Sequence, residues 1–516
     1  MSFIIEQKIN GRIYLYEVES YWDKEKKQPR QKRTYIGPKN KKNKSKLKQK
    51  TSKLINKNFG NIFLLKFITN QLGLTEILES VFPKTFSEIL ALCFFEIMED
   101  SPLYLFPYWL DEQHLDKTKK LHSSHISKLC DDLGRSQIER LDFVNQWIEH
   151  LKPIKGIYYD ITSISSYSTN IDFIEWGYNR DHENLPQLNM GVTFCQNNYL
   201  PIYYNLYPGS IVDVTTLKNC IKYLKVFHLK DILFILDRGF FSKANVLEMH
   251  NNENKIEFIQ PVPFTLKKVK KILRKYKRSL KNPSNSFRFK EEILHHLLTT
   301  LEFDKHTFDA HLFFNEKAEI NEKHHFLRMI FEFEERLKNK KFITLKEYLR
   351  YRESNIPKKI VKYFKWNKTT LCIEKNMKTI KANLTKMGCF ILLTNKQIKK
   401  TDLLNLYRQR DGVEKVFDIV KNAMDGDRLR AHSQYNTEGR LFIKFIALII
   451  YTEISKIMRE KNLFKKYSVK ELLAELKKLK IIKIKNNDLF LSELSKKQKL
   501  IFKAFGIKEE NLLHSY

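Results

Sequence analysis

A run of short apolar segments between Gly156 and Ile259 constrains the fold of this chain more than any other feature. Each segment has the length and the content of β-branched and aromatic residues that are typical of a buried strand, and helical patterns separate the later segments. The expected strands are 156–165, 188–194, 200–206, 231–237 and 255–259, and the expected helices are 213–226 and 242–250. The predicted order is therefore β-β-β-α-β-α-β, with three successive strands followed by two crossover connections.

This order is that of an RNase H-like core, so we predict an α/β fold with a mixed five-stranded sheet and flanking helices. The pattern breaks at about residue 264, where a basic amphipathic helix is expected at 266–278, and a longer charged helix is expected at 321–340. A strand at 388–394 and an apolar helix at 438–458 then resume the core. We therefore expect an insertion domain to interrupt the RNase H-like catalytic core.

The segments before and after the core have different sequence patterns. Polar and apolar residues alternate on both sides of Asn10 and Gly11, which predicts a β-hairpin, and a run rich in lysine from Lys39 to Lys50 predicts a linker. Before the core, we predict a hairpin with a basic linker at 1–50 and a helical domain that we expect to bind DNA ends at 51–152. The core has its first part at 153–263 and its second part at 387–460, with the insertion at 264–386 between them. A basic helical tail follows at 461–516.

Two aspartates lie in strands that are otherwise apolar. Asp160 is inside the first strand, and Asp237 ends the fourth. An acid in an apolar strand costs free energy unless another group offsets its desolvation, and the carboxyl ends of strands are where open α/β folds gather functional groups. Either aspartate alone is more often a turn or capping residue, so a third acid is needed to support a metal site.

The segment from Leu406 to Asn422 supplies that third acid on a predicted helix. At about 100° per residue, four side chains fall within a stripe of roughly 60° on one side. They are Tyr407, Arg410, Glu414 and Lys421. A carboxylate flanked by cations suits a divalent metal next to a phosphate backbone, although a charged helix face alone is more often solvated surface.

The formal net charge of the chain is +34, from 93 Lys and Arg against 59 Asp and Glu. Nucleic acid is the commonest partner of such a chain. A membrane surface is the other partner that such a charge suits. No N-terminal segment resembles a signal peptide and no apolar run is long enough to span a bilayer, so we expect no membrane partner and predict a cytoplasmic, nucleoid-associated protein. The six cysteines show no CxxC spacing, which predicts reduced thiols and no structural zinc.

The spacing Tyr407-x2-Arg410-x3-Glu414-x6-Lys421 resembles the YREK signature of DDE transposases of the IS-four-like group of bacterial insertion sequences. The segment around Asp160, the Asp237-Arg238-Gly239 turn and the extra segment before the glutamate are also similar to that group. The resemblance covers roughly residues 155–450.

The resemblance implies a transposase that cuts transposon ends and joins them to target DNA, acting as a homodimer on DNA at terminal inverted repeats. Its catalytic and metal-binding triad would be Asp160, Asp237 and Glu414, which would bind two Mg²⁺ or Mn²⁺ ions. The resemblance also implies that Tyr407, Arg410 and Lys421 hold phosphates of the transposon end, that Arg238 adds a phosphate contact, and that the insertion is mainly β.

Two other functions stay open on the sequence alone. One is an RNase H-like nuclease or resolvase that cuts DNA without strand transfer, and the other is a non-catalytic DNA-binding protein derived from a transposase. A further acid, Asp213, follows a Pro-Gly turn at the start of a predicted helix, and we expect it to be a helix N-cap rather than a metal ligand.

Overall fold

The computed structural model describes most of the chain. The described residues are 2–39, 55–99, 101–115, 118, 121–168, 171–178, 184–252, 256–337, 340–410, 412, 428–429, 431, 433–483 and 489–513. They form a mixed α/β structure that divides into two compact units, residues 1–56 with 481–492 and residues 57–480 with 493–516.

The smaller unit contains a three-stranded antiparallel sheet in the order β1 (Ser2–Ile9), β2 (Arg12–Asp23) and β3 (Gln28–Pro38). Asn10 and Gly11 form the two-residue turn between β1 and β2, and both have positive φ, 45° and 77°. Positive φ at both central residues is what a type I′ hairpin turn requires, so the hairpin forms where the sequence predicts it. The strands β18 (Leu489–Leu491), β17 (Lys480–Lys483) and β4 (Ile55–Asn58) pair in a second small sheet.

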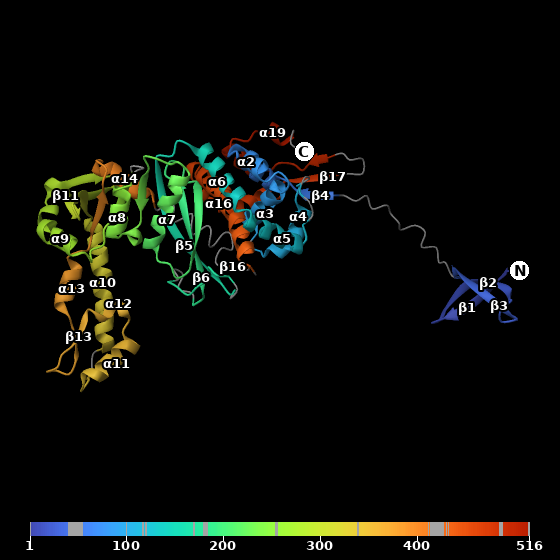
Figure 1. Ribbon diagram of the computed structural model, residues 1–516, viewed down its shortest axis with the longest axis horizontal. Coiled ribbons are helices and arrows are strands. Elements are labelled where there is room, and N and C mark those ends of the chain that lie inside the picture. The colour runs from blue at the N-terminus through green and yellow to red at the C-terminus, as the bar shows by residue number, and fades with distance from the viewer. Residues whose placement is uncertain are drawn as a thin grey trace. The chain divides into compact units, whose positions relative to one another are not determined.

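The larger unit is built on one long mixed sheet (Figure 1). Five of its strands match the strands predicted from the sequence, and they lie side by side in the order β7-β6-β5-β8-β9. Their bounds are β5 (Gly156–Ser166), β6 (Gln187–Cys195), β7 (Pro201–Pro208), β8 (Leu233–Leu236) and β9 (Glu257–Pro261). The pairs β5–β6 and β6–β7 are antiparallel, whereas β5–β8 and β8–β9 are parallel. Nearly every residue of β5, β6 and β8 is buried, because helices cover this part of the sheet.

The parallel pairs need crossover connections, and the predicted helices supply them. The helix α7 (Asp213–Val226) joins β7 to β8, and α8 (Lys243–His250) joins β8 to β9. A longer apolar helix, α16 (Gln434–Glu460), packs against β7 and also against the N-terminal helices of the unit (Figure 1). It therefore lies between the sheet and those helices.

The N-terminal helices occupy the region where the sequence predicts a helical pattern. They are α1 (Gly60–Gln71), α2 (Leu74–Val81), α3 (Phe86–Met98), α4 (Phe106–Glu112), α5 (Ser123–Arg135) and α6 (Gln137–Leu151). Glycines allow α5 and α16 to approach closely, because a Cβ on Gly134 would lie 1.9 Å from Tyr435 O and a Cβ on Gly439 would lie 1.9 Å from Cys130 O. No side chain larger than hydrogen fits at either crossing point.

The segment between β9 and β15 (Cys389–Thr394) contains both helices and strands, so the expectation of a mainly β insertion is wrong. Its elements are α9 (Lys267–Leu280), β10 (Ser286–Phe289), β11 (Glu292–Phe303), β12 (His306–Phe314), α10 (Glu316–Leu337), α11 (Leu345–Asn355), α12 (Lys358–Val361), β13 (Phe364–Trp366), β14 (Ile373–Lys375) and α13 (Met377–Leu384). Phe326, Ile330 and Leu337 on α10 pack with Ile356 and Ile360 in a hydrophobic cluster, which explains why this half is helical.

Three strands of this segment, β10, β11 and β12, belong to the long sheet itself, whereas β13 and β14 form a separate two-stranded sheet. The order continues as β10-β11-β12-β15-β9, and β15 is antiparallel to both β12 and β9. The strand at 388–394 therefore forms as predicted.

The chain ends in short helices, α17 (Val469–Leu476), α18 (Lys496–Ala504) and α19 (Glu509–Leu513). Within the described residues, no helix combines the length and the apolar character needed to cross a bilayer. All six cysteines are in the described part of the chain, and none of them forms a disulfide.

Candidate active site

The register of two parallel strands places Asp160 and Asp237 next to each other. In the β5–β8 pair, Tyr159 is opposite Leu236, so the next residue on each strand is an aspartate. Adjacent strands lie about 4.8 Å apart, and both strands run in the same direction here, so the two carboxylates lie side by side at the point where β8 ends. The structure thus brings together two acids that are 77 positions apart in the sequence.

The two aspartates differ in their surroundings. Asp160 lies inside β5, with strand residues before and after it. Its Oδ1 accepts a hydrogen bond of 2.9 Å from the backbone N–H of Ile161. Asp237 follows the last residue of β8, where the chain turns into a short 3-10 helix, Arg238–Phe240. The side chain of Asp160 is 21% exposed and that of Asp237 is 42% exposed, so both reach solvent from an otherwise buried sheet.

The helix α14 (Lys400–Gln409) lies on the face of β5 to which Asp160 points. Tyr158 and Asp160 are two residues apart on the strand and therefore point to the same face. The hydroxyl of Tyr158 donates a hydrogen bond of 3.2 Å to the carbonyl of Leu406 on α14. Leu403 and Leu404 bury the apolar side of this helix. These contacts fix the end of α14 beside the aspartates.

Arg410, at the C-terminal end of α14, bridges the two aspartates. One guanidinium nitrogen lies 3.9 Å from Asp160 Oδ2, and the other lies 3.5 Å from Asp237 Oδ1. The Arg410 side chain is only 10% exposed. A cation therefore already occupies the space that both carboxylates face, which shows that they share one electrostatic site.

Tyr407 and Arg238 complete this group. The guanidinium of Arg410 lies 5.9 Å from the centre of the Tyr407 ring. Burial raises the pKa of Tyr407; Arg410 and Arg238 oppose this rise with their positive charges, while Asp237 adds to it. Arg238 is exposed at the surface beside the site. Of the seven residues predicted for the site, the structure brings together Asp160, Asp237, Arg238, Tyr407 and Arg410.

Glu414 and Lys421 lie outside the described residues. The helix predicted from Leu406 to Asn422 is helical up to Gln409, but α14 ends there and Arg410 is its C-cap, so the prediction of one continuous helix is wrong. The N–H of Arg410 bonds to the carbonyl of Tyr407, three residues back, which tightens the last turn. In the part of the chain that the structure describes, no three His, Cys, Asp or Glu side chains are close enough together to hold a metal.

Asp213 has a different position from the one predicted. The N-cap of α7 is Val212, and Asp213 is the first residue of the helix, so the N-cap prediction is wrong. A Cβ on Gly239 would lie 3.3 Å from Asp213 Oδ2 and 3.8 Å from Asp237 Oδ2, so both carboxylates lie close to this glycine. Sequence reasoning missed this proximity, because an acid at the start of a helix looks the same whether it caps the helix or faces a neighbouring loop.

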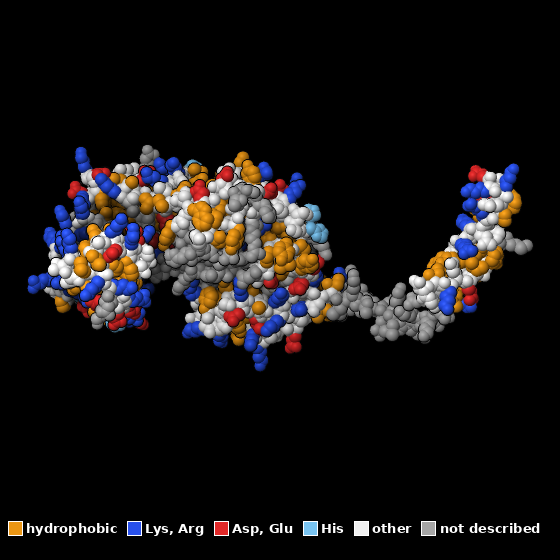
Figure 2. Space-filling model, turned by 90° about the horizontal axis from the view of Figure 1, so that it is seen from below, with side chains coloured by type: hydrophobic (Ala, Val, Ile, Leu, Met, Phe, Trp, Pro, Cys, Tyr) orange, Lys and Arg blue, Asp and Glu red, His pale blue; other side chains and the backbone are white. Residues whose placement is uncertain are grey.

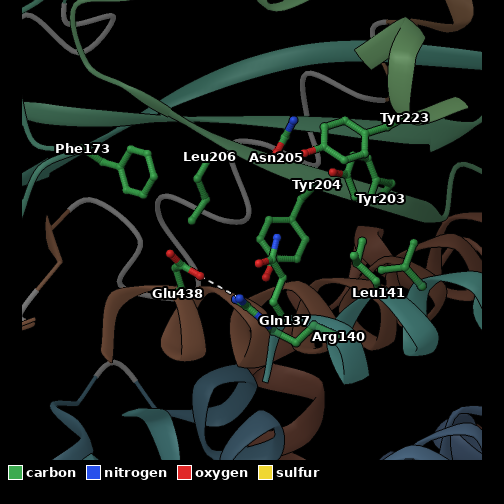
Figure 3. Close-up of a pocket in the computed structure, with 11 residues that line it drawn as sticks. Gln137, Arg140, Leu141, Phe173, Tyr203, Tyr204, Asn205, Leu206, Tyr223 and Glu438 are labelled. Atoms are coloured by element: carbon green, nitrogen blue, oxygen red, sulfur yellow. Dashed lines mark hydrogen bonds and ion pairs between the residues drawn. The ribbon is translucent and has the colours of Figure 1, made fainter. Parts of the chain in front are cut away.

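A separate pocket lies between α6, β7, α7 and α16 (Figure 3). Tyr203 and Tyr204 of β7 and Tyr223 of α7 line it, and Arg140 and Glu438 form an ion pair of 2.6 Å across it. The side chains of Arg140 and Glu438 are 12% and 17% exposed. The pair therefore joins α6 to α16, and the pocket does not contain the aspartates.

Comparisons with known proteins identify the family of this chain. Residues 152–450 match the transposase DDE domain family. A solved structure titled "piggyBac transposase synaptic complex with hairpin DNA" is similar over 81% of this chain and 79% of that chain, with 11% identity and a TM-score of 0.38. A search of curated proteins finds no match to the chain. Because the matched residues make up more than half of the chain and include both aspartates, the protein belongs to the transposase DDE domain family.

Proposed function

We propose that this transposase cleaves DNA at the ends of a transposon and joins those ends to target DNA, using an RNase H-like core. The observation that carries the proposal is the pairing of Asp160 with Asp237 at the point where β8 ends, with a single cation bridging both. The strand order β7-β6-β5-β8-β9, with its antiparallel and parallel pairs, supports an RNase H-like core. The large inserted segment and the basic groups at the site favour strand transfer over cutting alone.

The residues present suit a divalent metal. Carboxylate oxygens are the ligands that Mg²⁺ and Mn²⁺ prefer, and Asp160 and Asp237 present theirs toward one point. The position of the Arg410 guanidinium shows that this point accepts positive charge. We infer that Asp160, Asp237 and Glu414 hold two Mg²⁺ or Mn²⁺ ions, which would supply Lewis-acid stabilisation of a phosphodiester displacement.

The groups around the aspartates have complementary roles in this proposal. Arg410 and Arg238 would contact phosphate oxygens of the DNA end, with Lys421 as a third cation, and would place the scissile bond next to the carboxylates. Tyr407 is protonated at neutral pH, because the ordinary pKa of tyrosine is about 10 and burial raises it further, so its hydroxyl can donate a hydrogen bond to a phosphate. Water is the nucleophile when the end is cut, and the released 3′-hydroxyl is the nucleophile when the end is joined.

The rest of the proposal concerns assembly and location. Two ends must be brought together, so we infer a homodimer on DNA that binds terminal inverted repeats. We also propose that residues 51–152 bind the ends, that the boundaries predicted from the sequence delimit the remaining domains, and that the protein acts in the cytoplasm at the nucleoid.

The test is an assay with labelled duplexes that carry the inverted repeats flanking the gene. The proposal expects nicking with Mg²⁺ or Mn²⁺ and joining of the cut strand to a target plasmid. The Asp237→Asn variant should retain end binding but lose nicking by at least about 100-fold. As the matched control, Asp231→Asn changes an exposed aspartate on the same loop–strand segment and should leave nicking unchanged.

The outcomes separate the alternatives. Nicking without joined product would identify a nuclease or resolvase and overturn strand transfer. Equal nicking by the wild-type protein and Asp237→Asn would remove the aspartate pair from catalysis. End binding without nicking by the wild-type protein would identify a non-catalytic DNA-binding derivative.

A further inference from the structure

The helix α9 carries a stripe of cations on the side opposite its buried face. Lys267, Lys271, Arg274 and Arg278 are all exposed, and at about 100° per residue they fall within roughly 60° of one another. Val269, Leu273 and Leu280 form the buried face, on the opposite side of the helix. Since α9 packs on β11 and β12 through that buried face, the stripe faces away from the sheet.

The orientation of α9 is fixed by contacts on its flanks. Lys277 and Lys281 both approach the carboxylate of Glu319 on α10, at 3.3 and 2.6 Å. The side chain of Glu319 is 9% exposed, and the pKa of this carboxyl is lowered because hydrogen bonds and charges from the lysines outweigh the effect of burial. The helix is thus held so that it cannot turn its cationic side inward.

Among the described residues, no acid forms an ion pair with the stripe. The sequence of α9 contains no Asp or Glu, and within the described ranges none of the four cations forms an ion pair. Like charges three or four residues apart destabilise a helix by about 0.2–0.5 kcal/mol per pair, and cations in the first turn oppose the helix dipole. By contrast, α10 in the same inserted segment interleaves glutamates with its lysines and arginines.

Figure 2 shows Lys and Arg side chains gathered at the end of the larger unit where the inserted segment lies. From Lys267 to Arg278 the stripe extends along roughly 16 Å of helix axis, over which duplex DNA presents roughly ten phosphates. The catalytic aspartates lie in β5 and directly after β8, whereas α9 packs on strands beyond β9 in the sheet order. The stripe is therefore a surface separate from the site of cleavage.

We propose that Lys267, Lys271, Arg274 and Arg278 bind the phosphate backbone of duplex DNA, as a contact surface of the inserted segment that has no sequence preference. This proposal rests on the proposed function for its partner, because a protein that acts on DNA ends holds DNA beyond the scissile bond. The backbone carries the contact, since lysines on an exposed helix face recognise charge rather than bases.

The test compares two double variants of the full-length protein that lose the same charge. Lys267→Gln/Lys271→Gln removes two cations of the stripe, and the control Lys358→Gln/Lys359→Gln removes two exposed cations of α12 in the same inserted segment. Affinity for a labelled duplex is measured by fluorescence anisotropy over a range of salt concentrations without divalent metal. Because both variants alter exposed side chains, circular dichroism should show wild-type folding for each.

We expect the stripe variant to weaken duplex binding by at least about tenfold at low salt and to reduce the slope of log K against log salt by about 1 to 2, while the control changes neither by more than about twofold. Bound duplex should also slow chemical acetylation of Lys267 and Lys271 but not of Lys358 and Lys359. Equal losses in the two variants, or no protection of the stripe lysines, would overturn the proposal.

Two further outcomes are informative. If the stripe variant loses binding to anionic lipid vesicles rather than to duplex DNA, the surface serves a membrane and the proposal is wrong. If the wild-type protein binds no DNA at all, the proposed function itself fails. If the wild-type protein binds DNA and the stripe variant binds it equally well, only the inference about the stripe is overturned.

Discussion

Replacing Arg410 with glutamine should strengthen the binding of divalent metal to the DNA-free protein. The guanidinium lies 3.9 Å from Asp160 and 3.5 Å from Asp237, in the space that both carboxylates face. A metal ion that binds there must displace this cation or lie beside it. Glutamine keeps most of the volume of the side chain and removes the charge.

The size of the effect follows from the distances and the exposure. Two unit charges at about 4 Å interact by about 1 kcal/mol in water and about 4 kcal/mol near a protein surface. Since Asp237 is 42% exposed, solvent screens its interaction with Arg410. We therefore expect the loss of the Arg410 charge to improve the free energy of metal binding by about 1–2 kcal/mol. That corresponds to roughly a 5- to 30-fold lower Kd for Mn²⁺.

Titration calorimetry with Mn²⁺, or electron paramagnetic resonance of free Mn²⁺, measures this change without any turnover. The matched control is Arg408→Gln on the same helix, because Arg408 pairs with Glu292 at 2.7 Å and not with the aspartates. We expect the control to bind Mn²⁺ within about twofold of the wild-type protein. An Arg410→Gln variant with unchanged or weaker Mn²⁺ binding would refute the reasoning, because the guanidinium would then not compete for the carboxylates.

Three other predictions concern stability. Glu438→Gln should lower the free energy of unfolding by about 3 kcal/mol, because it leaves Arg140 largely buried without its counter-charge; a thermal melt unchanged from wild type would contradict this. Burial, followed by the charges of His311 and Lys400, lowers the pKa of His296 from 6.5 to about 4. Between about pH 4 and pH 6.5 this histidine is therefore protonated in the unfolded state but neutral in the folded state. The contribution of His296 to the free energy of unfolding is therefore fully present above about pH 6.5 and is lost as the pH falls toward 4. The His296→Phe variant should flatten that part of a curve of Tm against pH. Gly134→Ala should lower Tm by several degrees, because its Cβ would meet a backbone carbonyl of α16 at 1.9 Å, and an unchanged Tm would show that α5 can move away at little cost.

The sequence predicted the strands that carry the aspartates because the signals there are local. Each strand is an apolar run of the right length, and an acid in such a run is conspicuous, as Asp160 is in β5. The pairing of Asp160 with Asp237 depends in addition on the register of β5 and β8, which places Tyr159 opposite Leu236 although β5 continues to Ser166. Local rules were therefore sufficient for the strands but not for the register that joins them.

Other features depend on contacts that no local pattern reveals. The strand β11 contains two histidines and polar residues without clean alternation, and it becomes a strand because β10 and β12 pair with it. The bridge from Arg410 to both aspartates requires α14 to end where it does, which Tyr158 fixes from a strand almost 250 residues earlier. The position of Asp213 near Gly239 and Asp237 depends likewise on the packing of a loop.

The place of β15 in the long sheet has a consequence for how the chain is made. β15 pairs with β9 on one side and with β12 on the other, yet about 75 residues separate it from β12 along the chain. During translation, the edge of β9 that pairs with β15 therefore stays unpaired until the ribosome has released residue 394. An exposed strand edge in a nascent chain invites intermolecular pairing, so truncated products that stop within α10 to α13 should aggregate more than those that extend beyond β15.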